Sequence, residues 1–247
     1  MRPFAFAAAA FGAILAFAAC QSTQDRSAEL AKQGSTVLEK EQGLKVTQRS
    51  ADVKVVSSTV LSDVNGSAVV LGLRNDSSQT LTDVPIQVKV LDAKGRVVYT
   101  NTTPGLEPNL TSMPIVPPGD SYWVNDQVLA TGKPKTVKAE VGAGGSTLSG
   151  ELPDIEVGPP KLEQDPVSGL DVRGTVVNKT GKEQGPLLLF AVAKQGSKVV
   201  AAGRGGIDHL KPSTKALHYT IFFIGDPKGA KVDVTSFPTV EQASSSG

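Results

Sequence analysis

Short runs of alternating apolar and polar residues dominate the chain after residue 53. Residues 84–91 show this most clearly, with four valine or isoleucine side chains on one face and Gln87 and Lys89 on the other. A period of two residues is typical of a β-strand with one buried face. Asn65-Gly66, just ahead of another apolar run, is the dipeptide most typical of a tight hairpin turn. The pattern therefore predicts short strands joined by turns.

The first half of the chain contains six such strands by this pattern. They cover residues 53–61, 68–75, 84–91, 96–100, 120–129 and 136–141. A proline-rich connection occupies residues 104–119, and residues 142–150 are rich in glycine and serine. The second of these segments predicts a flexible boundary between two domains.

The same pattern returns in the second half of the chain. The matching segments are 68–75 with 169–178, 84–92 with 187–193, 92–98 with 194–200, 116–120 with 210–214, and 134–141 with 227–234. Chance similarity between turns rarely preserves the order of five matches, so we predict a tandem duplication with a period near 100 residues. Each copy has the length and strand number of an immunoglobulin-like sandwich.

Each copy carries short motifs at its strand ends and turns. In the first copy they are Leu73-Arg-Asn75, Val88-Lys-Val-Leu-Asp92, Gly95-Arg-Val-Val98 and Pro118-Gly-Asp120. In the second they are Val176-Val-Asn178, Phe190-Ala-Val-Ala-Lys194 and Gly196-Ser-Lys-Val-Val200. With these motifs the two copies resemble FxLYD-type domains, small immunoglobulin-like modules of prokaryotic exported proteins and lipoproteins. The first copy keeps the aspartate of the family's Phe-x-Leu-Tyr-Asp strand, and the second keeps its phenylalanine. The resemblance implies an extracytoplasmic immunoglobulin-like fold and no particular activity.

The N-terminus has a different pattern. Arg2 precedes an apolar run from Phe4 to Ala19 that contains no charged residue. A positive start, an apolar segment and small residues before a cleavage point are the three parts of a secretory signal peptide. The run is shorter than the roughly 20 residues that usually span a bilayer.

The end of this run reads Phe17-Ala-Ala-Cys20. It resembles the lipobox of bacterial lipoproteins, with phenylalanine in place of the usual leucine. The resemblance implies that Cys20 carries a diacylglyceryl group on its thiol and becomes the mature N-terminus. Cys20 is the only cysteine, so no disulfide can form within the chain. Two alternatives remain: Ala16-Phe-Ala18 fits the cleavage site of a freely secreted protein, and the run can stay as an uncleaved helix.

The predicted fold class is all-β, with two tandem immunoglobulin-like β-sandwich domains after a signal peptide and a flexible tether. The boundaries are 1–19 for the signal peptide, 20–50 for the lipidated N-terminus and tether, 51–143 for the first sandwich, 144–154 for the linker, 155–240 for the second sandwich and 241–247 for a disordered tail.

Charge is nearly balanced, with 25 Lys and Arg against 24 Asp and Glu and no long run of one sign. Nothing in this balance indicates nucleic acid, so we predict no nucleic-acid partner. The expected partners are the membrane, through the lipid on Cys20, and another envelope protein. The expected location is the cell membrane or outer envelope, facing the periplasm or the cell exterior.

Candidate catalytic groups are few. The two histidines are His209, in a loop-like stretch after Asp208, and His218, at the start of a strand. No Gly-x-Ser-x-Gly elbow supports a Ser-His-Asp site, and no His-x-x-His or Cys-x-x-Cys spacing supports a transition-metal site. Gly203-Arg-Gly-Gly is interpreted as a flexible turn. We therefore predict that the chain is not an enzyme and needs no cofactor.

The sequence leaves a calcium site, built from turn residues, open as an alternative to a chain without metal. Asp63, Asn65, Asp76 and Asp92 would supply hard oxygen ligands for calcium if they gathered at one end of a sandwich. These residue types are also the ordinary turn formers. Five Asn-x-Ser/Thr triplets, which beside a bacterial lipobox are interpreted as turn asparagines, begin at Asn65, Asn75, Asn101, Asn109 and Asn178.

Aromatic residues gather at Tyr122-Trp123 and along the segment from Tyr219 to Ile224. In that segment alternation places Tyr219 and Phe223 on one face and Phe222 on the other. We expect these side chains to lie mainly in the core. If exposed, they are candidates for partner contact: Tyr122, Trp123, Tyr219, Phe222 and Phe223.

The function expected from these patterns is a non-catalytic binding or scaffolding role for a membrane-anchored envelope lipoprotein. Two alternatives are kept. One is an accessory subunit of an envelope transport or secretion complex. The other is a carbohydrate-binding module or a degenerate enzyme, which exposed rows of aromatic rings would favour.

Overall fold

The computed structural model describes residues 44–166, 169–212 and 215–238. All strand pairs in this part of the chain are antiparallel, which confirms the all-β prediction. The signal peptide, Cys20, most of the tether and the predicted tail lie outside the described residues. Within the described residues no helix is long and apolar enough to cross a membrane.

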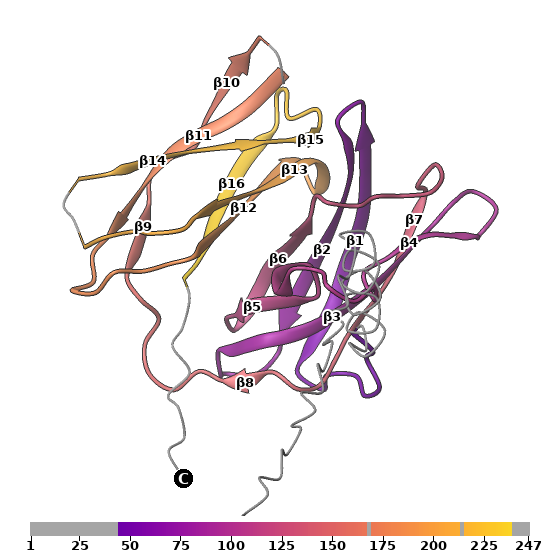
Figure 1. The fold of residues 1–247 in the computed structure, drawn as a ribbon, viewed down its shortest axis with the longest axis horizontal. Coiled ribbons are helices and arrows are strands. Elements are labelled where there is room, and N and C mark those ends of the chain that lie inside the picture. The colour runs from indigo at the N-terminus through magenta and orange to yellow at the C-terminus, as the bar shows by residue number, and fades with distance from the viewer. Residues whose placement is uncertain (1–43, 167–168, 213–214, 239–247) are drawn as a thin grey trace, which may run out of the picture. The chain divides into compact units, whose positions relative to one another are not determined.

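The N-terminal half, residues 44–150, consists of two sheets (Figure 1). One has the order β1-β2-β6. The other is organised around the long strand β3, which pairs with β5 and β8 through its first half and with β4 and β7 through its second half. The elements are β1 (Val53–Asp63), β2 (Gly66–Asn75), β3 (Leu81–Leu91), β4 (Val97–Thr100), the 3₁₀ helix η1 (Pro108–Leu110), β5 (Ser112–Val116), β6 (Gly119–Asn125), β7 (Thr136–Val141) and β8 (Ser146–Thr147).

The C-terminal half, residues 151–238, repeats this pairing. β11 lies between β10 and β14 as β2 lies between β1 and β6, and β12 pairs with β13 and β16 as β3 pairs with β4 and β7. The strands are β9 (Ile155–Val157), β10 (Lys161–Asp165), β11 (Gly169–Asn178), β12 (Leu187–Gln195), β13 (Lys198–Ile207), β14 (Leu217–Phe222), β15 (Ile224–Gly225) and β16 (Lys231–Phe237). Four of the five sequence matches fall on these equivalent strands and the turns that join them, namely 68–75 with 169–178, 84–92 with 187–193, 92–98 with 194–200 and 134–141 with 227–234.

β12 is apolar on both faces because both faces are buried. Leu189 and Ala191 belong to the core of the C-terminal half. Phe190 and Val192, which alternate with them, belong to the core cluster of the N-terminal half. The rings of Phe190 and Phe237 lie 4.9 Å apart at this junction. The sheets of β2 and β12 therefore pack on each other, and apolar packing as well as the linker joins the two halves.

The predicted linker, residues 144–154, starts as ordered strand. Ser146 and Thr147 form β8 and pair with β3. The backbone N–H of Leu148 then donates to Thr80 O at 2.8 Å. These hydrogen bonds hold the first part of the segment against the N-terminal half.

The aromatic segment near the C-terminus changes sheets at Phe223. β14 pairs with β11, whereas β15, which begins one residue after Phe223, pairs with β13 in the other sheet. Phe223 is 4% exposed at this crossing, and Phe222 before it is 54% exposed. The crossing explains why alternation fails here, since Phe223 and Ile224 are buried in succession.

β5 is a strand that the sequence pattern did not predict. It lies in the segment interpreted as a proline-rich connection. Pro114 cannot donate a ladder hydrogen bond, and within the part of the chain that the structure describes β5 pairs only with β3. An edge position is where a strand tolerates proline.

Candidate functional site

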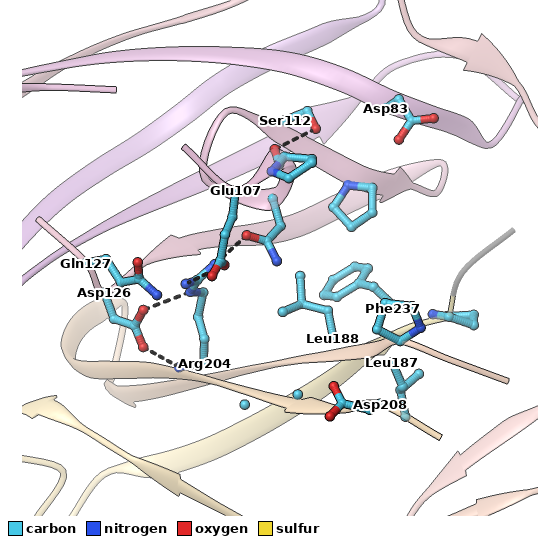
Figure 2. A pocket seen from close by; sticks show the side chains of 17 residues that line it. Asp83, Glu107, Ser112, Asp126, Gln127, Leu187, Leu188, Arg204, Asp208 and Phe237 are labelled. Atoms are coloured by element: carbon cyan, nitrogen blue, oxygen red, sulfur yellow. Dashed lines mark hydrogen bonds and ion pairs between the residues drawn. The ribbon is translucent and has the colours of Figure 1, made fainter. Parts of the chain in front are cut away.

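A cavity of about 650 Å³ lies between the two halves (Figure 2). The N-terminal half supplies Asp83 of β3, η1 with the residue before it, part of β5 and the residues after β6. The C-terminal half supplies the start of β12 and the ends of β13 and β16. The apolar part of the lining consists of Pro108, Pro114, Pro186, Leu187, Leu188, Phe237 and Pro238.

Arg204 of β13 crosses from the C-terminal half to this wall. Its side chain is only 6% exposed. Its Nε donates to Asp126 Oδ1 at 2.8 Å, its Nη1 donates to Asn109 Oδ1 at 2.9 Å, and its backbone N–H donates to Asp126 Oδ2 at 2.9 Å. A fourth oxygen, Glu107 Oε2, lies 3.9 Å from Nη2. Because a buried guanidinium needs these acceptors, the contact sets how the two halves meet here.

Trp123 holds the segment of the N-terminal half that receives Arg204. Its side chain is completely buried, and its Nε1 donates to Asn109 O at 3.0 Å and to Ser112 O at 3.2 Å. Ser112 Oγ in turn donates to Pro108 O at 3.0 Å. The indole therefore holds η1 and the start of β5, the segment that presents the Asn109 amide to Arg204.

The polar lining is acidic. It contains four carboxylates, on Asp83, Glu107, Asp126 and Asp208, and one guanidinium, on Arg204, so its formal charge is −3. Asp83, Glu107 and Asp208 are exposed at the mouth. Asp83 also has a positive φ of 53°, the only non-glycine residue with positive φ in the described ranges. Aspartate tolerates this left-handed conformation better than most residues do.

A second charged contact joins the halves away from the cavity. Lys194 Nζ lies 3.0 Å from Asp233 Oδ2 and 5.0 Å from the centroid of the Tyr122 ring. The hydrogen bond to Asp233 raises the pKa of Lys194, and the bond from Lys194 lowers the pKa of Asp233. Burial raises the pKa of Tyr99, whose hydroxyl accepts a hydrogen bond from Asn125 Nδ2 at 2.9 Å.

The aromatic residues proposed for partner contact lie in different environments. Trp123, Tyr219 and Phe223 are 0%, 6% and 4% exposed, so they are core residues in this fold. Tyr122 is half-buried beneath Lys194. Phe222 alone of the five is exposed, on β14.

The calcium ligands considered from the sequence do not gather. Asp63 closes the β1–β2 hairpin, whereas Asp76 follows the opposite end of β2. Asp63 Oδ2 instead accepts the Gly225 N–H at 2.7 Å. The backbone N–H of Arg96 is the main cause of a lowered pKa of Asp92. Across the described ranges no group of three His, Cys, Asp or Glu side chains is placed to hold a metal ion.

The interpretation of Gly203-Arg-Gly-Gly as a flexible turn is wrong, because these residues belong to β13. A Cβ atom on Gly203 would lie 2.0 Å from Phe222 O, and one on Gly205 would lie 2.9 Å from Ile221 Cγ1. The glycines permit β13 to pass close to β14. The sequence could have identified Arg204 as a site residue, because it is an arginine between glycines within an apolar strand. No comparable feature of the sequence marked Asp126.

His209 pairs with Glu183 and not with the neighbouring Asp208. His209 Nδ1 lies 2.9 Å from Glu183 Oε1, and the His209 side chain is 77% exposed. Asp208 instead lines the cavity.

Comparisons with known proteins do not assign the chain to a family. No protein-family model matches it, and no curated protein is significantly similar to it. The site is therefore interpreted from its own geometry.

Proposed function

We propose that the chain is an exported lipoprotein, anchored through Cys20, whose two immunoglobulin-like modules bind a partner without catalysing a reaction. The positive start, apolar run and Phe17-Ala-Ala-Cys20 support the anchor. The repeated pairing of β1–β8 and β9–β16 supports two modules of one kind. A lipid-anchored binding protein needs a rigid surface outside the bilayer, and packed sandwiches supply one.

The cavity between the halves is the observation that carries the binding role. Its volume of about 650 Å³ falls within the roughly 300–1,000 Å³ typical of ligand sites. It combines apolar walls with a few polar groups, as such sites do. Arg204 and Trp123 hold the walls in place before any ligand arrives, which reduces the entropy lost on binding.

One observation favours the alternative of an accessory subunit. Phe222 and Leu217 are 54% and 42% exposed on β14, and among the described strands β14 pairs only with β11. An exposed strand with apolar side chains is a common contact surface in assemblies. The carbohydrate-binding alternative lacks such support, because Phe222 is the only aromatic among the exposed large apolar side chains of the described residues.

Mass spectrometry of the mature N-terminus tests the anchor. We expect the chain to begin at Cys20 with two or three acyl chains, and to fractionate with membranes. Cys20→Ala should release it into the soluble fraction, because acyl burial supplies the affinity for the bilayer. A wild-type protein that begins at Ala19 with an unmodified thiol would contradict the anchor.

Photo-crosslinking in cells tests the binding role. A photoreactive amino acid at position 208, at the mouth of the cavity, should capture a discrete partner. The same group at position 154, which is exposed outside the cavity lining, is the matched control. Identical labelling from both positions would contradict a partner site at the cavity.

A further inference from the structure

The cavity lining offers more hydrogen-bond acceptors than donors. Four of its residues are prolines, which have no backbone N–H. Its side-chain donors are already committed in part, since Arg204 donates to Asp126 and Asn109, and Ser112 Oγ donates to Pro108 O. The amides of Asn109 and Gln127 add donors, but the oxygens of four carboxylates outnumber them. A ligand rich in donors therefore suits this lining.

Charge leads to the same requirement. The lining carries a formal charge of −3, because four carboxylates outnumber one guanidinium. Glu107 and Asp208 are exposed, one on the wall of the N-terminal half and the other on the wall of the C-terminal half. Leu188 and Phe237 belong to the apolar lining of the same cavity (Figure 2). Apolar side chains beside two acidic walls favour a cationic group carried on an apolar chain.

The structure already contains one example of this recognition. Arg204 reaches the wall of the N-terminal half from another part of the chain, and its guanidinium is received by a carboxylate and an amide of that wall. Arginine and lysine suit this chemistry, because their apolar stems pack on Leu or Phe side chains while the charged end meets a carboxylate.

We infer that the cavity binds a polypeptide segment of a partner protein in which lysine or arginine neighbours an apolar residue. The inference rests on the proposed function and specifies its ligand. The cavity is larger than one side chain requires, and its charged and apolar parts lie side by side. An extended segment presents neighbouring side chains of both kinds, whereas a small cation presents only the charge.

Synthetic pentapeptides test this inference on the chain from residue 20 onward, with Cys20→Ala to keep it out of membranes. The probes are acetyl-Leu-Lys-Leu-Lys-Leu-amide, the same peptide with glutamate in place of lysine, the same peptide with glutamine, and spermidine. Binding is measured by calorimetry at two salt concentrations. We expect saturable binding of the lysine peptide, at least about tenfold tighter than that of the glutamate peptide, and weaker at high salt.

Two double variants assign the binding to the cavity. Glu107→Gln with Asp208→Asn should weaken the lysine peptide by about tenfold or more, because it removes two of the lining charges. Glu151→Gln with Asp154→Asn removes the same charge from exposed positions outside the lining and should leave affinity unchanged. Thermal melting of both variants verifies that each is folded.

Three results would overturn the inference. They are equal affinity for the lysine and glutamate peptides, full affinity in the cavity double variant, and spermidine binding as tightly as the lysine peptide, which would make the ligand a small cation. If crosslinks from position 208 still appear in cells, only the ligand class is wrong. If they are absent as well, the proposed binding role fails.

Discussion

Asn75 and Asn178 end equivalent strands of the two halves, and their side chains make the same hydrogen bonds. Asn75 Nδ2 donates to Gln79 O at 2.8 Å and to Val116 O at 3.0 Å. Asn75 Oδ1 accepts from the backbone N–H of Ser77 at 3.0 Å and from its hydroxyl at 2.8 Å. One carboxamide therefore ties the end of β2 to the turn after it and to the end of β5.

The second half repeats this set residue for residue. Asn178 Nδ2 donates to Lys182 O and Leu210 O, both at 2.8 Å. Asn178 Oδ1 accepts from the N–H and the hydroxyl of Thr180 at 2.9 and 2.7 Å. In each of these two triplets the third residue, Ser77 or Thr180, donates the hydrogen bonds that the asparagine side chain accepts. These two triplets are turn motifs, as the sequence pattern suggested.

Replacing either asparagine should destabilise the fold. Asn75 and Asn178 are each 2% exposed, so alanine at either position would leave two carbonyl oxygens at a buried site without their hydrogen-bond donor. We expect Asn75→Ala and Asn178→Ala each to lower the free energy of unfolding by about 2–3 kcal/mol. Urea denaturation followed by circular dichroism measures this. Asn65→Ala, at the exposed tip of the first hairpin, is the control and should change stability by less than about 0.5 kcal/mol.

The contact between Arg204 and Asp126 should be one of the most costly to break. Arg204→Met leaves the Asp126 carboxylate without its buried partner, and we expect a loss of about 3–5 kcal/mol. A double-mutant cycle with Asp126→Asn measures the coupling between the two side chains. Arg74→Met is the matched control. Arg74 and Asp120 form a pair whose side chains are 52% and 63% exposed, and its loss should cost no more than about 1 kcal/mol.

Gly203 should not tolerate a side chain. The Cβ of Gly203→Ala would meet the carbonyl oxygen of Phe222, a backbone atom that cannot turn aside as a side chain can. We expect a loss of about 1–3 kcal/mol from this overpacking. Gly206→Ala, on the same strand, has its nearest contact at 4.0 Å, with Leu187 O. Equal melting temperatures for the two variants would show that β13 and β14 are not this close.

The pair of Lys194 and Asp233 should make stability depend on pH. The pKa of Asp233 is lowered, so its contribution is present above the unfolded aspartate value of about 3.9 and is lost as pH falls through the folded value. The pKa of Lys194 is raised, so its contribution is lost only as pH rises above about 10.4. Between these limits the pair should contribute a constant amount.

The measurement is the difference in stability between the wild-type chain and Asp233→Asn. Because the Asp233 side chain is 39% exposed, we expect no more than about 1 kcal/mol between pH 5 and 9. The difference should shrink as pH falls below the unfolded aspartate value of about 3.9 and through the lower folded value. A difference that grew on acidification would mean that Asp233 is not stabilised as the anion.

Local pattern was sufficient to predict much of the fold. Alternation along 84–91 and the Asn65-Gly66 signal reflect rules that operate between neighbouring residues, so strands and hairpin follow without knowledge of the rest of the chain. The loop itself consists of Val64 and Asn65, because Gly66 pairs with Asp63. The order of matching segments likewise indicated the repeat, because equivalent strands keep equivalent turns. β5 was not predicted because Pro114 argues against a strand. Proline is tolerated at the edge of a sheet, but an edge position is not a local property of the sequence.

Tertiary structure alone decided which apolar faces meet and what lies between them. β12 and the segment around Phe223 are apolar on both sides, and a period of two residues cannot tell which sheet covers each side. At the cavity wall Arg204 donates a hydrogen bond to Asp126, which lies 78 positions away in the chain. Such a pairing follows from the packing of whole sheets, because burial and the need to satisfy a guanidinium operate through space and leave no periodic mark on the sequence.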